Sequence, residues 1–172
     1  MRLILETERL ILRPFIAEDA NDMFNNWASD SEVAKYVTWN AHEHIETTKK
    51  ILSLWIEQYE KPERINFAIV VKENNELIGG IDVVGYLDQT PVLGYVLSRK
   101  YWGHGYMTEA CKKVIELLFS LGYNQIRIDS IGENVASNKV IQKCGGVYVE
   151  TYEDFFKMKN KFFKVNKYYV NK

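Results

Sequence analysis

The feature that most constrains this chain is a pair of alternating glycines directly before an amphipathic helix. Residues 100–110 read KYWGHGYMTEA, with Gly103 and Gly105 at the centre. Apolar residues then recur every three or four positions, which predicts a helix from Tyr106 to Leu121 with one buried stripe. The stripe consists of Met107, Ala110, Cys111, Val114, Leu117, Leu118 and Leu121. A helix that docks along such a stripe has its N-terminus fixed in space.

A fixed helix N-terminus that follows glycine is suited to bind an anion. About four backbone N–H groups there have no partner within the helix, and together they carry roughly half a positive charge. Glycines let the backbone approach a bulky anion closely, so that several N–H groups converge on it. The alternative is a plain strand-to-helix turn in which the glycines only relieve strain, and a short glycine motif alone does not decide between the two.

Two familiar nucleotide-binding loops do not fit these residues. A Walker loop ends in Gly-Lys-Ser/Thr, whereas Gly105 is followed by Tyr106 and Met107. A dinucleotide-binding fingerprint would have a third glycine where Thr108 stands, and it normally lies in an early βαβ unit.

The first half of the chain predicts an antiparallel meander accompanied by helices. Residue alternation and β-branched content predict strands at 8–15, 66–71, 77–84 and 92–97. Helical spacing predicts one helix from Asp19, and a capping box at Asn40–Glu43 predicts a second that runs to about Tyr59.

The second half predicts a βαβ unit. Strand 92–97, the glycine loop, the helix and strand 125–130 follow in order, so these two strands should run parallel. A helix at 136–143 stops at Gly145, and strands near 147–151 and 163–170 complete the chain. We therefore expect one α/β domain over residues 1–172, with a mixed sheet and helices on both faces.

Composition excludes several classes of protein. A chain of 172 residues with 47% apolar residues and a net charge of −1 fits one globular domain and gives no reason to expect binding to nucleic acid or a membrane. No apolar run is long enough to span a bilayer, so we expect a cytoplasmic protein. Cys111 and Cys144 form no CxxC pair, and His42 and His44 do not share a helical face, so we expect no metal.

Six lysines among residues 157–172 alternate with Phe and Tyr, which predicts an edge strand.

Residues 100–110 resemble the acetyl-CoA-binding motif of the GNAT acetyltransferase superfamily, Gln/Arg-x-x-Gly-x-Gly/Ala, with Lys100 in place of Gln/Arg. The residues YWG-x-GY-x-TEA within this segment are similar to those of the ribosomal-protein N-terminal acetyltransferases RimJ and RimL. Three further segments agree with this branch, namely ETERLILRP at 6–14, Gly94-Tyr95, and NVASNKVIQKCG at 134–145. The resemblance covers essentially the whole chain.

This resemblance implies a GNAT-like fold and an acetyl-CoA-dependent N-acetyltransferase without a metal. The strand that contains Gly94 would splay from strand 125–130, and the gap would take the pantetheine arm of acetyl-CoA. Trp39 and His42 would lie on the substrate side. The cofactor-binding residues that the resemblance implies are Val96, Leu97, Ser98, Lys100, Gly103, His104, Gly105, Tyr106, Met107, Thr108, Asn134, Asn138 and Lys143.

Attack of an amine on a thioester requires stabilisation of the oxyanion and a proton for the leaving thiolate. We expect the backbone N–H of Val96 or Leu97 to stabilise the oxyanion. Many relatives supply the proton from a Tyr at the position of Ile141, and the RimJ/RimL branch suggests Ser137 as the substitute, with Asn134 facing the thioester. Helix capping is the alternative role for Asn134 and Ser137.

The general base and the acceptor stay open. Relatives often carry a Glu at the position of Val92, and here Asp82 and Glu133 are the candidates. An α-amine has a pKa of about 7.7–8.0, against about 10.4 for lysine, so an α-amine is partly neutral even without a strong base. This favours α-amines over lysine side chains. The resemblance to the RimJ/RimL branch implies the N-terminal Ala or Ser of a protein, such as a ribosomal protein, as the acceptor, and a small-molecule amine is the other candidate. A non-catalytic acyl-CoA sensor is the alternative.

Overall fold

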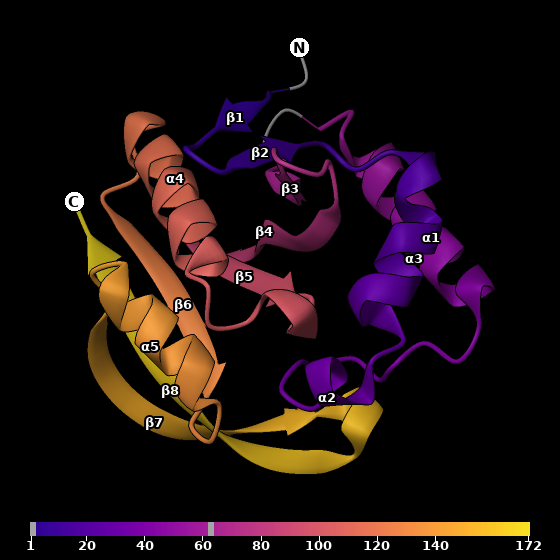
Figure 1. Cartoon of the computed structure of the whole chain (residues 1–172). Helices are drawn as coiled ribbons and strands as arrows, with labels where there is room; N and C mark the ends of the chain where they lie inside the picture. The colour runs from indigo at the N-terminus through magenta and orange to yellow at the C-terminus, as the bar shows by residue number, and fades with distance from the viewer. Residues whose placement is uncertain (1–2, 62–63) are drawn as a thin grey trace.

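A computed structural model describes residues 3–61 and 64–172. Eight strands form one mixed sheet in the order β1-β2-β3-β4-β5-β6-β8-β7 (Figure 1). Their bounds are β1 Leu5–Glu6, β2 Leu10–Arg13, β3 Asn66–Val71, β4 Leu77–Leu87, β5 Thr90–Leu97, β6 Gln125–Ile131, β7 Val147–Phe156 and β8 Lys161–Asn171. β1 to β5 pair antiparallel, and β5 and β6 pair parallel. The predicted meander and βαβ unit are confirmed.

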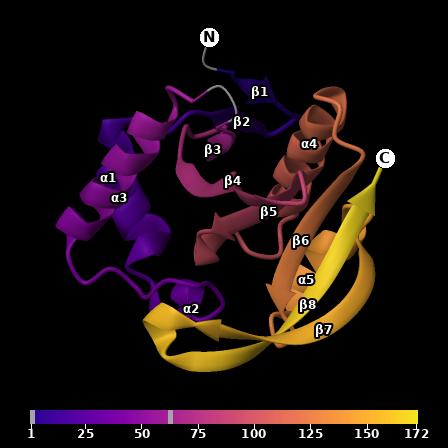
Figure 2. The same cartoon turned by 180° about the vertical axis from the view of Figure 1, so that it is seen from behind.

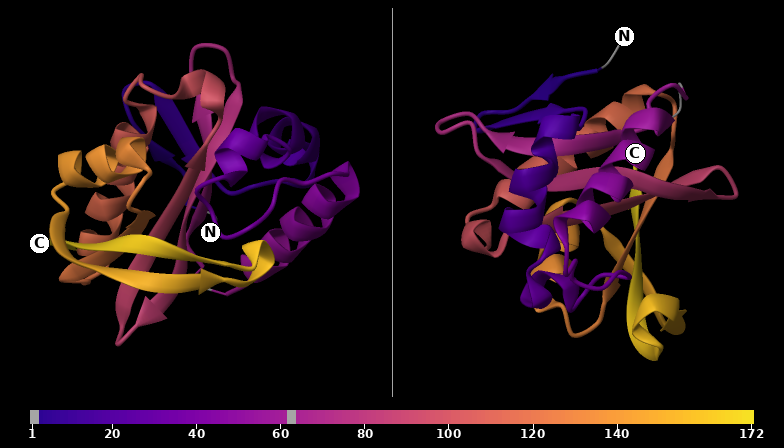
Figure 3. Two further views of the ribbon diagram at one scale, coloured as in Figure 1. Left: turned by 90° about the horizontal axis from the view of Figure 1, so that it is seen from below. Right: turned by 90° about the vertical axis from the view of Figure 1, so that its right-hand side faces the viewer.

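Helices cover both faces of the sheet (Figure 3). α4 (Tyr106–Ser120) and α5 (Val135–Lys143) lie on one face, and α1 (Ala20–Met23) and α3 (Ile45–Gln58) lie on the other. Each face has its own apolar core. Beneath α4 the core includes Leu93, Val114 and Ile128, and beneath α1 and α3 it includes Trp27 and Leu52. Because the sheet is buried on both faces, β3 is apolar along nearly its whole length.

Of the predicted strand at 8–15, Leu10–Arg13 forms β2, and a tight turn joins β2 to β1, which lies before the predicted range. The first helical region is a 3-10 turn at Ala17–Asp19, then α1, then a π-helical turn at Phe24–Ala28. A short helix not predicted from the sequence, α2 (Ser31–Ala34), follows. Further 3-10 turns lie at Arg99–Tyr101 and Lys157–Lys159.

The capping box predicted at Asn40 is wrong. α3 begins at Ile45 with His44 as its N-cap residue, and the side chain of Asn40 donates a hydrogen bond to the carbonyl of Met158 instead, at 2.8 Å. Met158, whose carbonyl binds Asn40 in place of the helix N-terminus, lies more than one hundred residues later in the chain, at the tip of the β7–β8 hairpin.

The predicted edge strand at the C-terminus is also wrong, because β8 lies between β6 and β7 and pairs with both. β7 forms the edge of the sheet. The tip of the β7–β8 hairpin reaches α2, where Lys159 donates to the carbonyl of Ala34 at 2.7 Å (Figure 2). In the described part of the chain, no helix has both the length and the apolar character needed to cross a bilayer.

Candidate active site

The two central strands part where the site begins. The β5–β6 ladder consists of Val92 with Arg127 and Leu93 with Ile128, although β5 continues to Leu97. β4 stays paired with β5 over the same stretch. β5 therefore remains on β4, and a gap opens between β5 and β6. The predicted splay is confirmed.

The register of β4 and β5 decides which main-chain groups point into this gap. Ser98 donates its N–H to the carbonyl of Ile78 at 2.7 Å, so Ser98 is directed toward β4. Backbone groups alternate along a strand, so Val96, which lies opposite Gly80, is also directed toward β4. Leu97 is directed into the gap. Of the two predicted oxyanion donors, the register favours Leu97 over Val96.

The glycine loop presents bare backbone at the N-terminus of α4. Gly103 and Gly105 have φ values of 78° and 80°, a left-handed conformation that residues with a side chain rarely adopt. A Cβ atom added at Gly103 would meet no described atom within 4 Å, and one at Gly105 would meet a guanidinium nitrogen of Arg9 at 3.5 Å. A bulky anion can therefore approach this backbone, and the loop fits the diphosphate of a coenzyme.

An open depression of about 360 Å³ lies beside the loop. Its lining consists of Glu8, Gly105, Thr108, Glu109, Lys112 and Lys143. The structure thus places Lys143 next to the glycine loop, together with Lys112, which the sequence analysis missed. Lys112 lies four residues after Thr108, on the same side of the helix, and that spacing could have revealed it.

Lys100 is directed away from this depression. It pairs with Glu76 at 3.0 Å, and Glu76 also accepts a hydrogen bond from the Tyr101 hydroxyl at 2.6 Å. These contacts, first that of Tyr101 and then that of Lys100, hold the pKa of Glu76 below its ordinary value. A further cation at the loop is Arg9, from the turn between β1 and β2, which donates to the carbonyl of His104 at 3.0 Å. The sequence analysis did not single out Arg9.

Ser137 and Asn134 have different roles at the start of α5. The side chain of Asn134 caps the helix by accepting the N–H of Ser137 at 3.1 Å. The Ser137 hydroxyl does not cap, because it lies 2.9 Å from the hydroxyl of Tyr95 on β5. Burial raises the pKa of Tyr95 far above its ordinary value, so this hydroxyl stays protonated. A pair of hydroxyl groups therefore connects β5 and α5.

Asn138 is engaged within the protein. Its amide nitrogen donates to the carbonyls of Ile131 at 3.0 Å and Asn134 at 2.8 Å. Its oxygen accepts from Asn166 at 3.0 Å and Tyr168 at 2.7 Å. Asn138 is buried, and this network joins α5 to β8. We therefore assign Asn138 to the support of α5 and leave it out of the proposed cofactor contacts.

On the other face of the sheet, His42 and Trp39 pack together before α3. Their ring centroids lie 5.5 Å apart, and Nδ1 of His42 lies 2.7 Å from the Thr48 hydroxyl. His42 is buried, and burial lowers its pKa, so its ring favours the neutral form. This contact between His42 and Thr48 anchors the segment that precedes α3 to the first turn of that helix.

Asp82 lies on β4 directly opposite Gly94, the first residue of β5 beyond the last rung shared with β6. Burial raises the pKa of Asp82, although Arg64, which pairs with it at 3.0 Å, opposes the shift. Glu133, the other candidate base, is exposed on the loop before α5. A half-buried carboxylate with a raised pKa beside the splay is the better placed of the two.

Comparison with known proteins agrees with this geometry. A family model described as "Acetyltransferase (GNAT) domain" matches residues 9–147. The chain is 30% identical to the "Uncharacterized N-acetyltransferase p20" of Bacillus licheniformis over 164 residues, which cover 94% of this chain and 92% of the relative. The chain therefore belongs to the GNAT acetyltransferase family, and it is an N-acetyltransferase.

Two solved structures share its fold. One is the ribosomal α-N-protein acetyltransferase RimL in complex with coenzyme A, with a TM-score of 0.86 and 16% identity over 98% of each chain. The other is the microcin self-immunity acetyltransferase MccE in complex with acetyl-CoA and AMP, with a TM-score of 0.85 and 17% identity over 96% of this chain and 94% of MccE.

Proposed function

We propose that this protein transfers the acetyl group of acetyl-CoA to a primary amine, with the donor between β5 and β6. One observation carries the proposal: β5 and β6 stop pairing at Leu93 and Ile128 although both strands continue, and the opening adjoins two left-handed glycines at a helix N-terminus. The complexes of RimL with coenzyme A and of MccE with acetyl-CoA support this choice of donor.

The donor's diphosphate is held by backbone N–H groups of the glycine loop. Unpaired N–H groups and the helix dipole favour a phosphate there, and Lys112 and Lys143 add positive charge at the edge of the loop. The pantetheine arm lies along β5 in the gap, where Leu97 exposes its main chain. The loop contacts in the proposal are Gly103, His104, Gly105, Tyr106, Met107 and Thr108.

Acetyl-CoA supplies the thioester, and the protein orients it and manages charge. The N–H of Leu97 donates to the oxygen that becomes negative as the amine attacks. The hydroxyls of Tyr95 and Ser137 lie 2.9 Å apart, and either can donate to the other. In the proposed step Tyr95 donates to the Ser137 oxygen, the hydroxyl hydrogen of Ser137 passes to the departing sulfur, and solvent returns a proton to Ser137. A carbon–nitrogen bond forms and the carbon–sulfur bond breaks. The nitrogen loses one proton and the sulfur gains one.

The acceptor is the α-amine of a protein N-terminal Ala or Ser, with Asp82 as the group that takes its proton. An α-amine with a pKa of about 7.7–8.0 needs only modest help from a base, which suits a carboxylate that is already paired with Arg64. The resemblance of the sequence motif at the glycine loop to that of RimJ and RimL favours a ribosomal protein as the acceptor. A small-molecule amine is the second candidate, because MccE, which binds AMP, has the same fold.

A thiol-release assay over an amine panel tests this proposal. The panel contains peptides that begin with Ala or Ser, the same peptides with blocked N-termini, and small amines, and calorimetry measures acetyl-CoA binding in parallel. We expect thiol release with the free peptides and none with the blocked ones. Release on small amines alone would overturn the acceptor, binding without release on any amine would favour the sensor, and absence of binding would overturn the donor site.

A further inference from the structure

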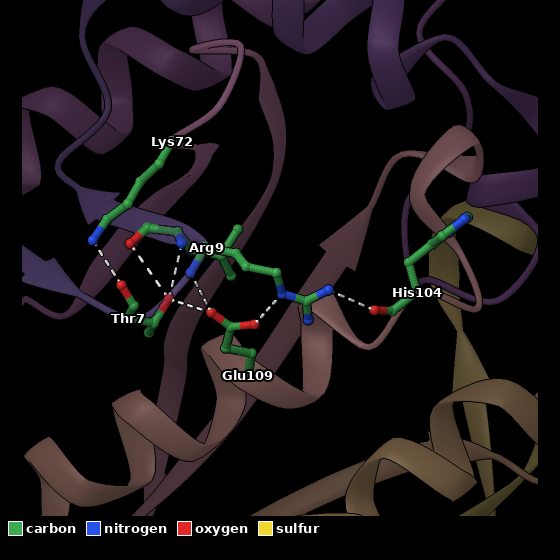
Figure 4. A network of polar contacts seen from close by, with 6 residues as sticks. Thr7, Arg9, Lys72, His104 and Glu109 are labelled. Atoms are coloured by element: carbon green, nitrogen blue, oxygen red, sulfur yellow. Dashed lines mark hydrogen bonds and ion pairs between the residues drawn. The ribbon is translucent and has the colours of Figure 1, made fainter.

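The turn between β1 and β2 is fastened to the first turn of α4 by four residues, which we name the Arg9 clamp: Thr7, Arg9, His104 and Glu109 (Figure 4). The carboxylate of Glu109 accepts three hydrogen bonds from this turn. They come from the Thr7 hydroxyl at 2.6 Å, the Arg9 backbone N–H at 2.9 Å and the Arg9 Nε at 2.7 Å. One carboxylate thus joins segments about one hundred residues apart in the sequence.

The far end of the Arg9 side chain reaches the glycine loop. Nη1 donates to the carbonyl of His104 at 3.0 Å, and the guanidinium lies 4.2 Å from the ring centroid of Tyr106. His104 and Tyr106 flank Gly105, so Arg9 contacts the residues on both sides of the second glycine. A planar guanidinium can bond a carboxylate and a carbonyl at a fixed separation, which a lysine cannot do.

The loop needs this support because it has little packing of its own. Trp102, Gly103, His104 and Gly105 are all exposed, and glycine is the residue with the greatest backbone freedom. The indole N–H of Trp102 donates to the carbonyl of Leu97 at 2.9 Å and fixes the start of the loop. The bond from Arg9 to His104 fixes its second half.

The charges of the clamp are arranged for an anion above the loop. Burial alone would raise the pKa of Glu109, but the hydrogen bonds from Thr7 and Arg9 outweigh it and lower the pKa, so Glu109 is charged. An unpaired carboxylate in this depression would repel a phosphate. Arg9 offsets that charge and places its guanidinium between Glu109 and the loop.

From these contacts we infer that Arg9, held by Glu109 and Thr7, is a positioning residue for the donor's diphosphate. It acts through the carbonyl of His104 and the ring of Tyr106, which set the direction of the loop's N–H groups. This inference rests on the proposed function, since it assumes that the glycine loop binds the diphosphate. If Arg9 has this role, its substitution should weaken the use only of acetyl donors that carry a diphosphate.

The test compares acetyl-CoA with S-acetylpantetheine, which has the same thioester but lacks the diphosphate and the adenosine 3′-phosphate attached to it. Arg9→Gln should raise the KM for acetyl-CoA about tenfold, the loss expected for one hydrogen bond to a charged group, with kcat within about twofold. Its kcat/KM for S-acetylpantetheine should stay within about twofold of the wild-type value. Lys113→Gln is the matched control, because it removes one positive charge from the same helix, and it should leave both donors unaffected. An equal loss with both donors would overturn the inference.

Two further variants separate positioning from charge. Arg9→Lys keeps the charge but loses the fork, so it should resemble Arg9→Gln, and full recovery of the KM would overturn a positioning role. Combining Arg9→Gln with Glu109→Gln should cost no more than Arg9→Gln alone, because the two residues act as one unit. Additive losses would contradict the clamp.

Binding measurements keep this test separate from the proposed function. The Kd of coenzyme A, measured by calorimetry for the wild-type protein and for the Arg9 and Lys113 variants, requires no acceptor amine. Failure of the wild-type protein to bind coenzyme A would overturn the donor site itself. Tight binding by the wild-type protein with an unchanged Kd in Arg9→Gln would overturn the clamp alone.

Discussion

The donor side and the acceptor side of the splayed strands are built in different ways. The donor side that we propose centres on one continuous stretch, in which β5 leads through the glycine loop into α4, and its contacts come mainly from backbone groups. The acceptor side that we propose draws on separate elements, with Asp82 on β4 and Trp39 before α3. The contrast explains why a short sequence motif is enough to predict the donor site. The acceptor site is harder to predict, because it depends on contacts between segments that are distant in the sequence.

The largest effect should come from the hydroxyl pair at the boundary between the two sides. Ser137→Ala removes the group that we place near the departing sulfur, so kcat should fall about 100-fold, at the lower end for a general acid. The KM for acetyl-CoA should change less than about threefold. Steady-state kinetics measure both, and Ser120→Ala at the end of α4 is the matched control. An unchanged kcat in Ser137→Ala would mean that this hydroxyl only supports the structure.

Gly105→Ala tests whether the donor side works through bare backbone. The added methyl group should disturb about one charged hydrogen bond to the diphosphate, worth roughly 2 kcal/mol or about 30-fold in the Kd of coenzyme A. Gly122→Ala is the control, since Gly122 also has a positive φ, of 98°, and lies beyond the other end of α4. Both variants should lose about 1–2 kcal/mol of stability from left-handed strain, and only Gly105→Ala should lose affinity. Equal affinities in calorimetry would contradict the placement of the loop.

A comparison of Asp82→Asn with Glu133→Gln tests the acceptor side. Asp82→Asn should lower kcat about tenfold with an α-amine, less than for an obligatory base because such an amine is partly neutral already. Since burial raises the pKa of Asp82 and the base must be deprotonated, the wild-type rate should rise with pH through that pKa. The variant should lose this limb of the pH–rate profile. A larger loss in Glu133→Gln would transfer the role to Glu133.

The smallest effect concerns stability at the Arg9 clamp. A carboxyl whose folded pKa lies below its ordinary value of 4.5 stabilises the fold above that value, and the contribution disappears as the pH falls through the folded pKa. Glu109→Gln should therefore cost up to about 1 kcal/mol of unfolding free energy near neutral pH and less in acid. Denaturant unfolding at several pH values measures the difference. A gap between the two proteins that widens in acid would contradict the assigned pairing.

Local patterns predicted the elements that carry the donor site. The helix at Tyr106, the strands around it and the stop at Gly145 follow from periodicity and glycine placement, and the structure confirms them. At Gly145–Gly146 the N–H groups return to the carbonyls of Gln142 and Ile141, as expected for a helix end of this type.

Contacts between distant segments were beyond such patterns. The motif at Asn40 has the residues of a capping box, yet the carbonyl of Met158 binds its side chain. The choice between Val96 and Leu97 depends on the register with β4, which the sequence of β5 alone does not contain. The partners of the Asn138 side-chain oxygen lie on β8. The contact between Arg9 and Glu109 joins two motifs whose spacing in the sequence does not predict that they meet.

A crystal structure of the complex with coenzyme A tests the central claim most directly. We predict that the diphosphate oxygens lie within hydrogen-bonding distance of backbone N–H groups between Gly103 and Thr108, with the pantetheine arm beside Leu97. Coenzyme A bound elsewhere on the protein, with no phosphate at this loop, would contradict the account.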